Sequence, residues 1–367
     1  MAEAASIVIG GGLAGSAFAI ELARQGRPVV IFEKTTGQHH KVCGEFLSAE
    51  AQNLLARLGI DVWKLGARPA SLLGLEFGGR TERIKLPFCG AGLSRFLLDQ
   101  ALLDIAARVG ARVVRGVSVT KLEYARQTAV VHTATQRLPA THVALATGKH
   151  NLRGFPRPLA RTVAFKMQLS VDSGAAATLE DVVQLAMFPD GYAGACLVEG
   201  GIATTCWVIN QEAQEYSSVT WDDHSTFLSK RSSFFATLLK CATPLWDKPV
   251  AVAAIPYGFL RHDVISDGIY PLGDQLVVIP SYTGDGTSIA LHTGITGARA
   301  VIDEQPAGKF QEDSIAKLKP QIAWAKMANI AFVNGKAQRA TAAIAAVAPW
   351  LVPKMARLVT NMTRLQV

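Results

Sequence analysis

Gly10-Gly11-Gly12-Leu13-Ala14-Gly15 directly follows the apolar run Ala5 to Ile9 and begins a stretch with helical periodicity. This pattern predicts a strand, a glycine turn and a helix that together hold a pyrophosphate. Gly10 allows the tight turn, Gly12 lets backbone N–H groups approach the phosphates, and Gly15 permits close packing of the helix on the strand. The N-terminus of the helix adds partial positive charge.

A second apolar run, Pro28 to Phe32, ends in Glu33, about 20 residues beyond the turn. A carboxylate in this position can accept hydrogen bonds from the ribose hydroxyls of an adenosine. The turn and the carboxylate together predict a dinucleotide-binding domain at the N-terminus.

The composition indicates a large interior and a reducing compartment. The chain has 367 residues and 49% hydrophobic content, which predicts two lobes. Its five cysteines form no CxxC pair and no metal-ligand spacing, and His39 and His40 lack a fourth ligand near Cys43, so we expect neither disulfides nor a metal. The N-terminus lacks the basic start of a signal peptide, and no apolar run reaches membrane-spanning length, so we expect a cytoplasmic protein.

The net charge of +8 arises at the C-terminal end of the chain. Eight Lys and Arg residues lie between Ser314 and Val367, where no Asp or Glu occurs, and Trp324 and Trp350 lie among them. Such a segment can make peripheral contact with the anionic inner surface of a membrane, and it can equally be a helical cap with a solvated basic face. No nucleic-acid recognition motif accompanies the charge, so we expect no nucleic-acid partner.

Three further segments combine apolar residues with a small-residue turn. Ala144 to Gly148 ends in Thr147-Gly148, and Ile269 to Asp274 ends in a carboxylate that can bond a sugar or ribitol hydroxyl. Pro280 to Ser288 is a glycine loop that leads into a helix with free N–H groups. These segments, in this order after the first turn, indicate a nucleotide-binding domain completed by sequence-distant pieces.

On these four segments the sequence resembles the FAD-binding oxidoreductases with the p-hydroxybenzoate hydroxylase fold, which include aromatic hydroxylases, flavin halogenases and geranylgeranyl reductases. The resemblance implies that Arg95 lies beside the pyrophosphate and that Asp274 meets the ribitol, although Arg95 can also be a surface residue and Asp274 a turn former. The residues that it places around FAD are Gly10, Gly12, Leu13, Ala14, Gly15, Glu33, Lys34, Arg95, Thr147, Gly148, Gly273, Asp274, Gly284, Gly286, Thr287 and Ser288.

The resemblance also implies the architecture. We expect an α/β fold with a Rossmann-like FAD-binding domain, an inserted antiparallel β-sheet substrate domain and a C-terminal helical region. The expected FAD-binding domain comprises residues 1–71, 89–153 and 257–300, and the substrate domain residues 72–88 and 154–256. The helical region comprises residues 301–367.

The sequence departs from the hydroxylase pattern at two positions. Thr147-Gly148 stands where hydroxylases usually have Asp-Gly, and Ser288 stands where Asn often follows the last glycine loop. Cys43-Gly44-Glu45 instead resembles the Cys-Gly-Gly loop of the geranylgeranyl reductases, which lies beside the flavin. Cys43 and Glu45 are therefore candidate catalytic residues that exchange a proton with the substrate. Alternatively, Cys43 is a small buried residue and Glu45 a charge near a helix start.

We therefore expect an FAD-dependent oxidoreductase that acts on an apolar small molecule. Monooxygenation is the commoner activity on this fold, which favours a hydroxylase by analogy. Reduction of a carbon–carbon double bond and flavin binding without turnover are the alternatives. No second GxGxxG is visible, so either NAD(P)H binds transiently as the electron donor or a separate reductase supplies the electrons.

Overall fold

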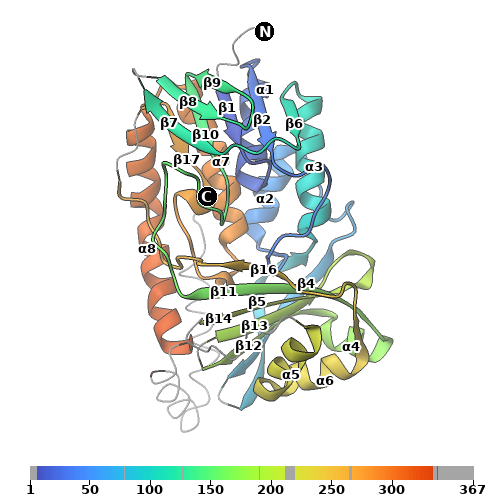
Figure 1. Ribbon diagram of the computed structural model, residues 1–367. Coiled ribbons are helices and arrows are strands. Elements are labelled where there is room, and N and C mark those ends of the chain that lie inside the picture. Colours follow the sequence, from blue (N-terminus) through green and yellow to red (C-terminus); the bar gives the residue numbers. More distant parts are fainter. Residues whose placement is uncertain are drawn as a thin grey trace.

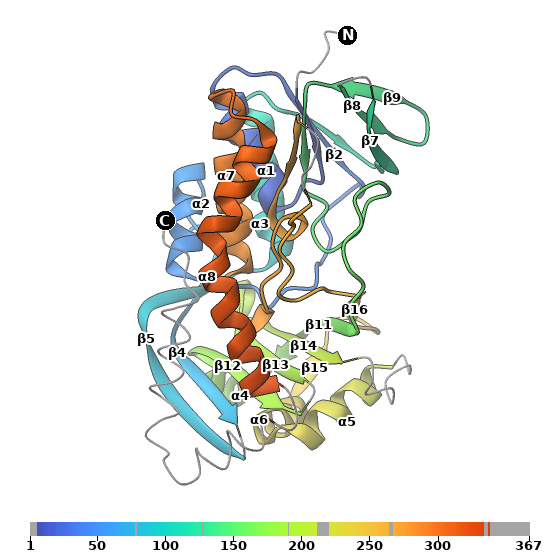
Figure 2. The same ribbon diagram turned by 90° about the vertical axis from the view of Figure 1, so that its left-hand side faces the viewer.

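The computed structural model describes residues 6–77, 79–125, 128–189, 191–210, 220–263, 267–333 and 337. Two large sheets lie one above the other, with a parallel sheet in the upper part of Figure 1 and a mostly antiparallel sheet below it. Helix α8 (Ala307–Val333) runs alongside both parts in Figures 1 and 2. It contacts a strand of each sheet, β17 and β12.

The upper sheet is entirely parallel. Its order is β17 (Ile269–Pro271), β10 (His142–Leu145), β1 (Ser6–Ile9), β2 (Val29–Glu33) and β6 (Arg112–Arg115). Four helices pack on one face: α1 (Leu13–Arg24), α2 (Ala49–Leu58), α3 (Arg95–Arg108) and α7 (Gly286–Ile302). A small sheet of β7 (Lys121–Ala125), β8 (Thr128–His132) and β9 (Arg137–Ala140) covers the other face. Side chains alternate along β1, so Val8 faces the helices whereas Ile7 and Ile9 face the small sheet.

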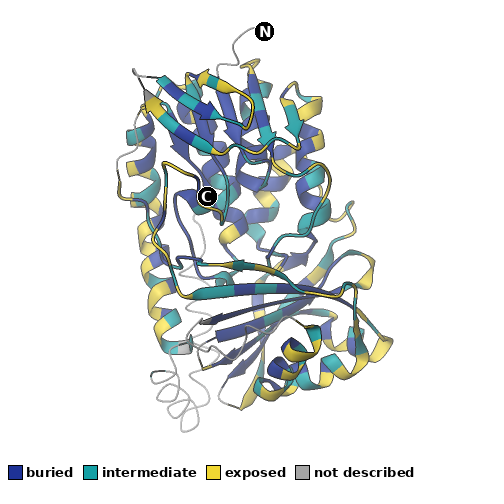
Figure 3. Ribbon diagram, in the orientation of Figure 1, coloured by how far each residue is buried: buried dark blue, intermediate teal, exposed yellow. Residues whose placement is uncertain are grey.

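The lower sheet has nine strands and is antiparallel except where β12 pairs with β4. Its order is β15 (Ala242–Pro244), β11 (Thr162–Val171), β14 (Ala203–Asn210), β13 (Gly191–Leu197), β12 (Asp181–Phe188), β4 (Arg68–Phe77), β5 (Arg80–Gly92) and β3 (Phe46–Leu47), with β16 (Val250–Ala253) also paired to β11. Helices α4 (Ser173–Leu179), α5 (Trp221–Arg231) and α6 (Ser233–Leu238) cover its lower face. The outer surfaces of α5 and α6 are exposed in Figure 3. Short 3-10 turns lie at Glu199–Gly201, Leu239–Cys241, Gly273–Gln275 and Ser281–Thr283.

Strand β11 shows how the lower sheet divides its side chains between two environments. Phe165, Met167 and Leu169 pack against the helices below. Lys166 and Gln168 alternate with them and therefore lie on the upper face, toward the parallel sheet. Polar groups on this face consequently become part of the region between the two sheets.

The predicted fold class is confirmed, because the structure combines a parallel Rossmann-like domain with a largely antiparallel sheet and C-terminal helix. Residues 46–47, 68–92 and 162–253 supply the strands of the lower sheet, and the predicted domain boundaries stay a prediction. Most of the basic tail, from Arg339 onward and including Trp350, lies outside the described residues. Within the described residues, no helix combines the length and apolar character needed to cross a bilayer.

Candidate functional site

The carboxyl ends of the parallel strands meet at one edge, where they line a cavity of about 510 Å³. Gly10 follows β1, Glu33 ends β2, Thr147 follows β10 and Asp274 follows β17, and all four residues line this cavity. Ligands of open α/β sheets bind at this edge, where the strand order reverses. Of the residues expected around FAD and the two catalytic candidates, only Gly15 and Ser288 do not line the cavity.

The glycines of the first turn have distinct physical roles. Gly10 has φ +104°, and a Cβ placed there would lie 2.5 Å from the carbonyl oxygen of Ala146. A Cβ at Gly15 would lie 2.0 Å from the carbonyl oxygen of Gly10, so Gly15 permits helix packing instead of lining the cavity. At Gly12, the cap of α1, the nearest atoms to such a Cβ are Lys41 Nζ at 3.5 Å and Arg95 Nη2 at 3.6 Å. The backbone at Gly12 therefore faces two cations.

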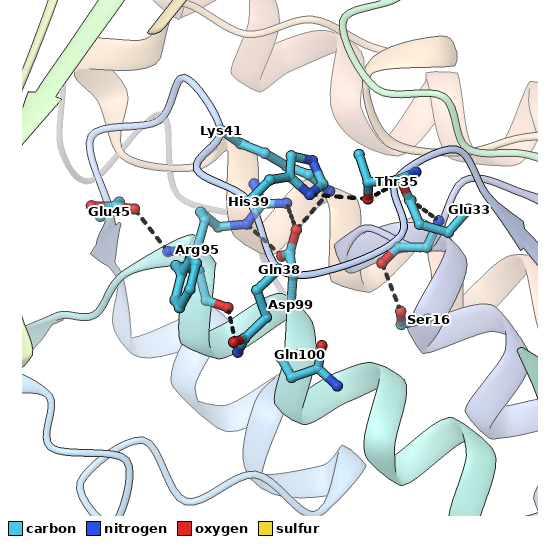
Figure 4. A network of polar contacts seen from close by, with 12 residues as sticks. Ser16, Glu33, Thr35, Gln38, His39, Lys41, Glu45, Arg95, Asp99 and Gln100 are labelled. Atoms are coloured by element: carbon cyan, nitrogen blue, oxygen red, sulfur yellow. Dashed lines mark hydrogen bonds and ion pairs between the residues drawn. The ribbon is translucent and has the colours of Figure 1, made fainter. Parts of the chain in front are cut away.

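Asp99 holds both cations in place (Figure 4). Its Oδ1 lies 2.7 Å from Arg95 Nε and its Oδ2 2.7 Å from Lys41 Nζ. Burial alone would raise the pKa of Asp99, but Arg95 and Lys41 lower this pKa to about 2. Burial likewise acts to lower the pKa of Arg95, and the adjacent carboxylate of Asp99 outweighs it, so that this pKa is raised. The two cations and the start of α1 form a site suited to a pyrophosphate.

The sequence interpretation identified Arg95 but missed Lys41 and Asp99. Asp99 lies four residues after Arg95, which places the two side chains on the same face of α3. This spacing was the feature of the sequence that could have predicted an ion pair between Arg95 and Asp99. Nothing in the polar loop before Cys43 distinguished Lys41 from a solvated lysine.

Glu33 is pre-arranged to accept hydrogen bonds. Its Oε2 accepts from the Gly11 N–H at 2.9 Å, and its Oε1 accepts from the Thr35 N–H at 3.1 Å and the Thr35 hydroxyl at 2.9 Å. Burial raises the pKa of Glu33, but Lys41 and these donors outweigh burial and leave the pKa below its ordinary value. The anionic carboxylate suits the ribose hydroxyls of an adenosine. Lys34, exposed at the next position, lines the same part of the cavity.

The opposite wall is formed by backbone turns. The backbone carbonyl of Asp274 accepts from Arg157 Nη1 at 2.7 Å, which fixes the turn while the side chain lines the cavity. Gly284 has φ +77° and precedes the start of α7, where Thr287 reaches the cavity. The Ser288 hydroxyl instead donates to the carbonyl of Asp285 at 2.8 Å. The start of α7, whose first N–H groups have no partner within the helix, therefore borders the cavity, which Thr147, Gly148 and Gly273 also line.

The loop Cys43-Gly44-Glu45 closes the cavity toward the lower sheet. Glu45 is buried and has φ +60°, a left-handed conformation that favours glycine. Its carboxylate accepts from the Arg95 N–H at 2.8 Å, from Gln168 Nε2 at 3.2 Å and from the fully buried ammonium of Lys166. The Glu45 N–H donates to Cys43 Sγ at 3.4 Å. The ion pair between Glu45 and Lys166 helps to hold the left-handed backbone at Glu45 in place.

The sequence interpretation missed Lys166 and Gln168, although both interrupt an apolar strand at alternate positions. Such polar residues on one side of a strand were the only signal for a buried network.

Residues 8–70 match the family described as NAD(P)-binding Rossmann-like domain. The menaquinone reductase of Mycobacterium tuberculosis is 32% identical over 146 residues, which are 38% of this chain and 34% of that protein. The chain thus spans about a third of the length of that relative. Digeranylgeranylglycerophospholipid reductase 2 of Methanosphaera stadtmanae is 27% identical over 335 residues, which are 83% of this chain and 80% of that protein.

Solved structures show the same fold. The flavin-dependent brominase Bmp2 superimposes with a TM-score of 0.79 at 16% identity and covers 99% of this chain and 94% of its own. The halogenase PltM in complex with phloroglucinol and FAD has a TM-score of 0.74 at 14% identity, covering 97% and 82%. Together with the glycine turn and its paired cations, these likenesses confirm the predicted resemblance: the chain has a Rossmann-like FAD-binding fold and is similar to flavoproteins that include these halogenases and reductases.

Proposed function

We propose that this protein is an FAD-dependent oxidoreductase that reduces a carbon–carbon double bond in an apolar substrate. The observation that carries the proposal is a cavity whose lining has a charged part and an apolar part. The charged part contains the two cations and Glu33, which suit FAD. The apolar part consists of Val42, Val250, Val252 and Val278, which belong to one hydrophobic cluster. The names of the two reductase relatives support this choice.

The residues present fit FAD. Gly12, Lys41 and Arg95 would hold the pyrophosphate, Glu33 the adenosine ribose and Asp274 the ribitol. FAD, when bound, supplies the electron pair for the reduction. Reduction of the double bond breaks one π bond and forms two C–H bonds, so the site must also deliver a proton. The Cys43 thiol lines the cavity and is our candidate donor. Glu45, held by three donors, would keep this loop in position. NAD(P)H binding transiently, or a separate reductase, would restore the electrons.

Hydroxylation, favoured from the fold alone, stays a prediction and is the second candidate. The test is to reduce the purified flavoprotein without oxygen and add extracts of unsaturated lipids. Substrate-dependent flavin reoxidation under anaerobic conditions supports the reductase. Reoxidation that requires one oxygen per product supports the hydroxylase. If neither kind of reoxidation occurs, the protein is a flavin-binding protein without turnover. Cys43→Ala should slow the anaerobic reaction with FAD still bound, whereas Cys89→Ala, an exposed residue outside the cavity, should not.

We also propose that α8 makes peripheral contact with an anionic lipid surface, which would deliver apolar substrates. Lys317, Lys319 and Lys326 are exposed on this helix, and Met327 and Ile330 are each 59% exposed. Each cation adds about 1 kcal/mol near an anionic surface, and salt weakens the attraction. Co-sedimentation with anionic but not neutral vesicles, reversed by salt, would support this contact. Equal binding to both vesicles would contradict it.

A further inference from the structure

Three hydroxyl groups lie close together, and two of them, on Tyr257 and Ser281, belong to residues that line the cavity. The Tyr257 hydroxyl and the Ser281 hydroxyl form a hydrogen bond of 2.7 Å, and both residues line the cavity. Tyr192, on β13 of the lower sheet, is only 5% exposed and interacts electrostatically with Tyr257. Within the described part of the chain, its hydroxyl has no hydrogen bond of regular geometry. Tyr192 is close enough to interact with both Tyr257 and Ser281 but does not line the cavity, so within this cluster Tyr257 and Ser281 are the groups that can meet a polar ligand atom there.

The surroundings of this hydroxyl cluster are apolar. Val208 and Val278 belong to the same buried cluster as Tyr192, and Tyr257 packs against it. Burial raises the pKa of both tyrosines above their ordinary value, so both phenols keep their protons at neutral pH. A protonated phenol donates a hydrogen bond, and its natural partner is an acceptor oxygen. An apolar wall with phenol donors therefore suits a hydrophobic molecule that has a carbonyl oxygen.

We propose that Tyr257, together with Ser281, binds the carbonyl oxygen of an α,β-unsaturated substrate such as a quinone ring or an enone. This inference rests on the proposed double-bond reduction and names its substrate class. When a hydride adds to the β-carbon, the alkene π bond breaks and its electrons move toward the carbonyl oxygen. The hydroxyl donors of Tyr257 and Ser281 would stabilise the negative charge that develops there. A proton then adds to the α-carbon, which completes the two new C–H bonds.

The experiment compares two probes that differ in their oxygens: 2,3-dimethyl-1,4-naphthoquinone and 2,3-dimethylnaphthalene. Each is titrated into the oxidised FAD-loaded protein, and binding is followed through the flavin absorption spectrum. We expect the quinone to bind about tenfold more tightly than the hydrocarbon. Tyr257→Phe should weaken quinone binding about tenfold and leave hydrocarbon binding unchanged, and Ser281→Ala should act in the same direction.

Tyr282→Phe is the matched control. It removes the same group from the neighbouring tyrosine, whose hydroxyl donates to the carbonyl of Ala325 and which does not line the cavity. Equal affinity of the wild-type protein for both probes would overturn the inference. So would equal losses in Tyr257→Phe and Tyr282→Phe. If Tyr257→Phe fails to retain FAD, Ser281→Ala decides the matter. If the quinone binds more tightly than the hydrocarbon but no anaerobic turnover occurs, the result would contradict the proposed reduction and still support this binding site.

Discussion

The edge of the parallel sheet and the upper face of the nine-stranded sheet border one cavity but are built differently. At the edge, turns that directly follow strands provide backbone N–H groups and glycines, as at Gly10, Gly12 and Gly148. On the sheet face and beside it, distant segments bring together side chains, as in the pair Glu45 and Lys166. The backbone turns at the sheet edge are thus encoded in local motifs, whereas the paired side chains, including Lys41 with Asp99 and Glu45 with Lys166, come together only in the folded chain.

We expect the largest effect, on FAD binding, from a substitution in the glycine turn after β1. Gly12→Val places a branched side chain toward Lys41 and Arg95, where the pyrophosphate would lie. We expect the variant to fold and to lose its bound FAD, measured as the loss of flavin absorbance after gel filtration with an unchanged circular dichroism spectrum. Gly37→Val is the control, because a Cβ at Gly37 meets no atom within 4 Å. Retention of FAD by Gly12→Val would show that the turn does not bind the cofactor.

The next test breaks the long-range pair. Glu45→Gly relieves the left-handed backbone but leaves the buried ammonium of Lys166 without its partner, so we expect the free energy of unfolding to fall by about 3 kcal/mol. The double variant Glu45→Gly with Lys166→Met should recover most of this loss. Urea unfolding of the FAD-loaded protein measures both. If the double variant loses as much stability as Glu45→Gly and Lys166→Met lose together when made singly, the two residues are not coupled.

Low pH should weaken the stability that comes from the charged cluster around Asp99. The pKa of Asp99 is lowered to about 2 in the folded protein from about 3.8 when unfolded. The unfolded state therefore binds more protons between these values, and the stability from Asp99 is present above pH 4 and is lost as the pH falls toward 2. We expect wild type to lose about 2 kcal/mol more between pH 5 and pH 2 than Asp99→Asn.

Urea unfolding at each pH measures this difference. Asp104→Asn, an exposed residue on the same helix, is the control and should behave as wild type. An Asp99→Asn variant with the wild-type pH dependence would show that Asp99 makes no such contribution.

The smallest effect concerns one hydrogen bond. Asp274→Ala should weaken FAD binding by about 1.5 kcal/mol, or roughly tenfold, because a charged acceptor for a ribitol hydroxyl is lost. Arg157 bonds the backbone of Asp274, so the turn should persist in the variant. Titration of the apoprotein with FAD measures the affinity. An unchanged value would make Asp274 a turn former.

Local signals explain what could be predicted. The Gly10 turn and the start of α7 at Gly286 agree with the sequence patterns, because neighbouring residues determine them. Lys166 could not be connected to Glu45, since 121 residues separate them and only the position of β11 over the loop brings them together. Tyr192 and Tyr257 could not be predicted as site residues either, because a tyrosine in an apolar stretch is typical of a hydrophobic core.

The left-handed backbone at Glu45 also limits how this site can evolve. Replacing Glu45 by glycine would suit the backbone but would leave the buried ammonium of Lys166 without its carboxylate partner. Loss of Lys166 first would leave the buried carboxylate of Glu45 without its ion pair. Each single step passes through a less stable protein, so the two positions are expected to change as a pair or not at all. Once acquired, such a pair becomes entrenched. Among homologues, a lysine at position 166 should therefore accompany an acidic residue at position 45, and glycine at 45 should accompany an uncharged residue at 166.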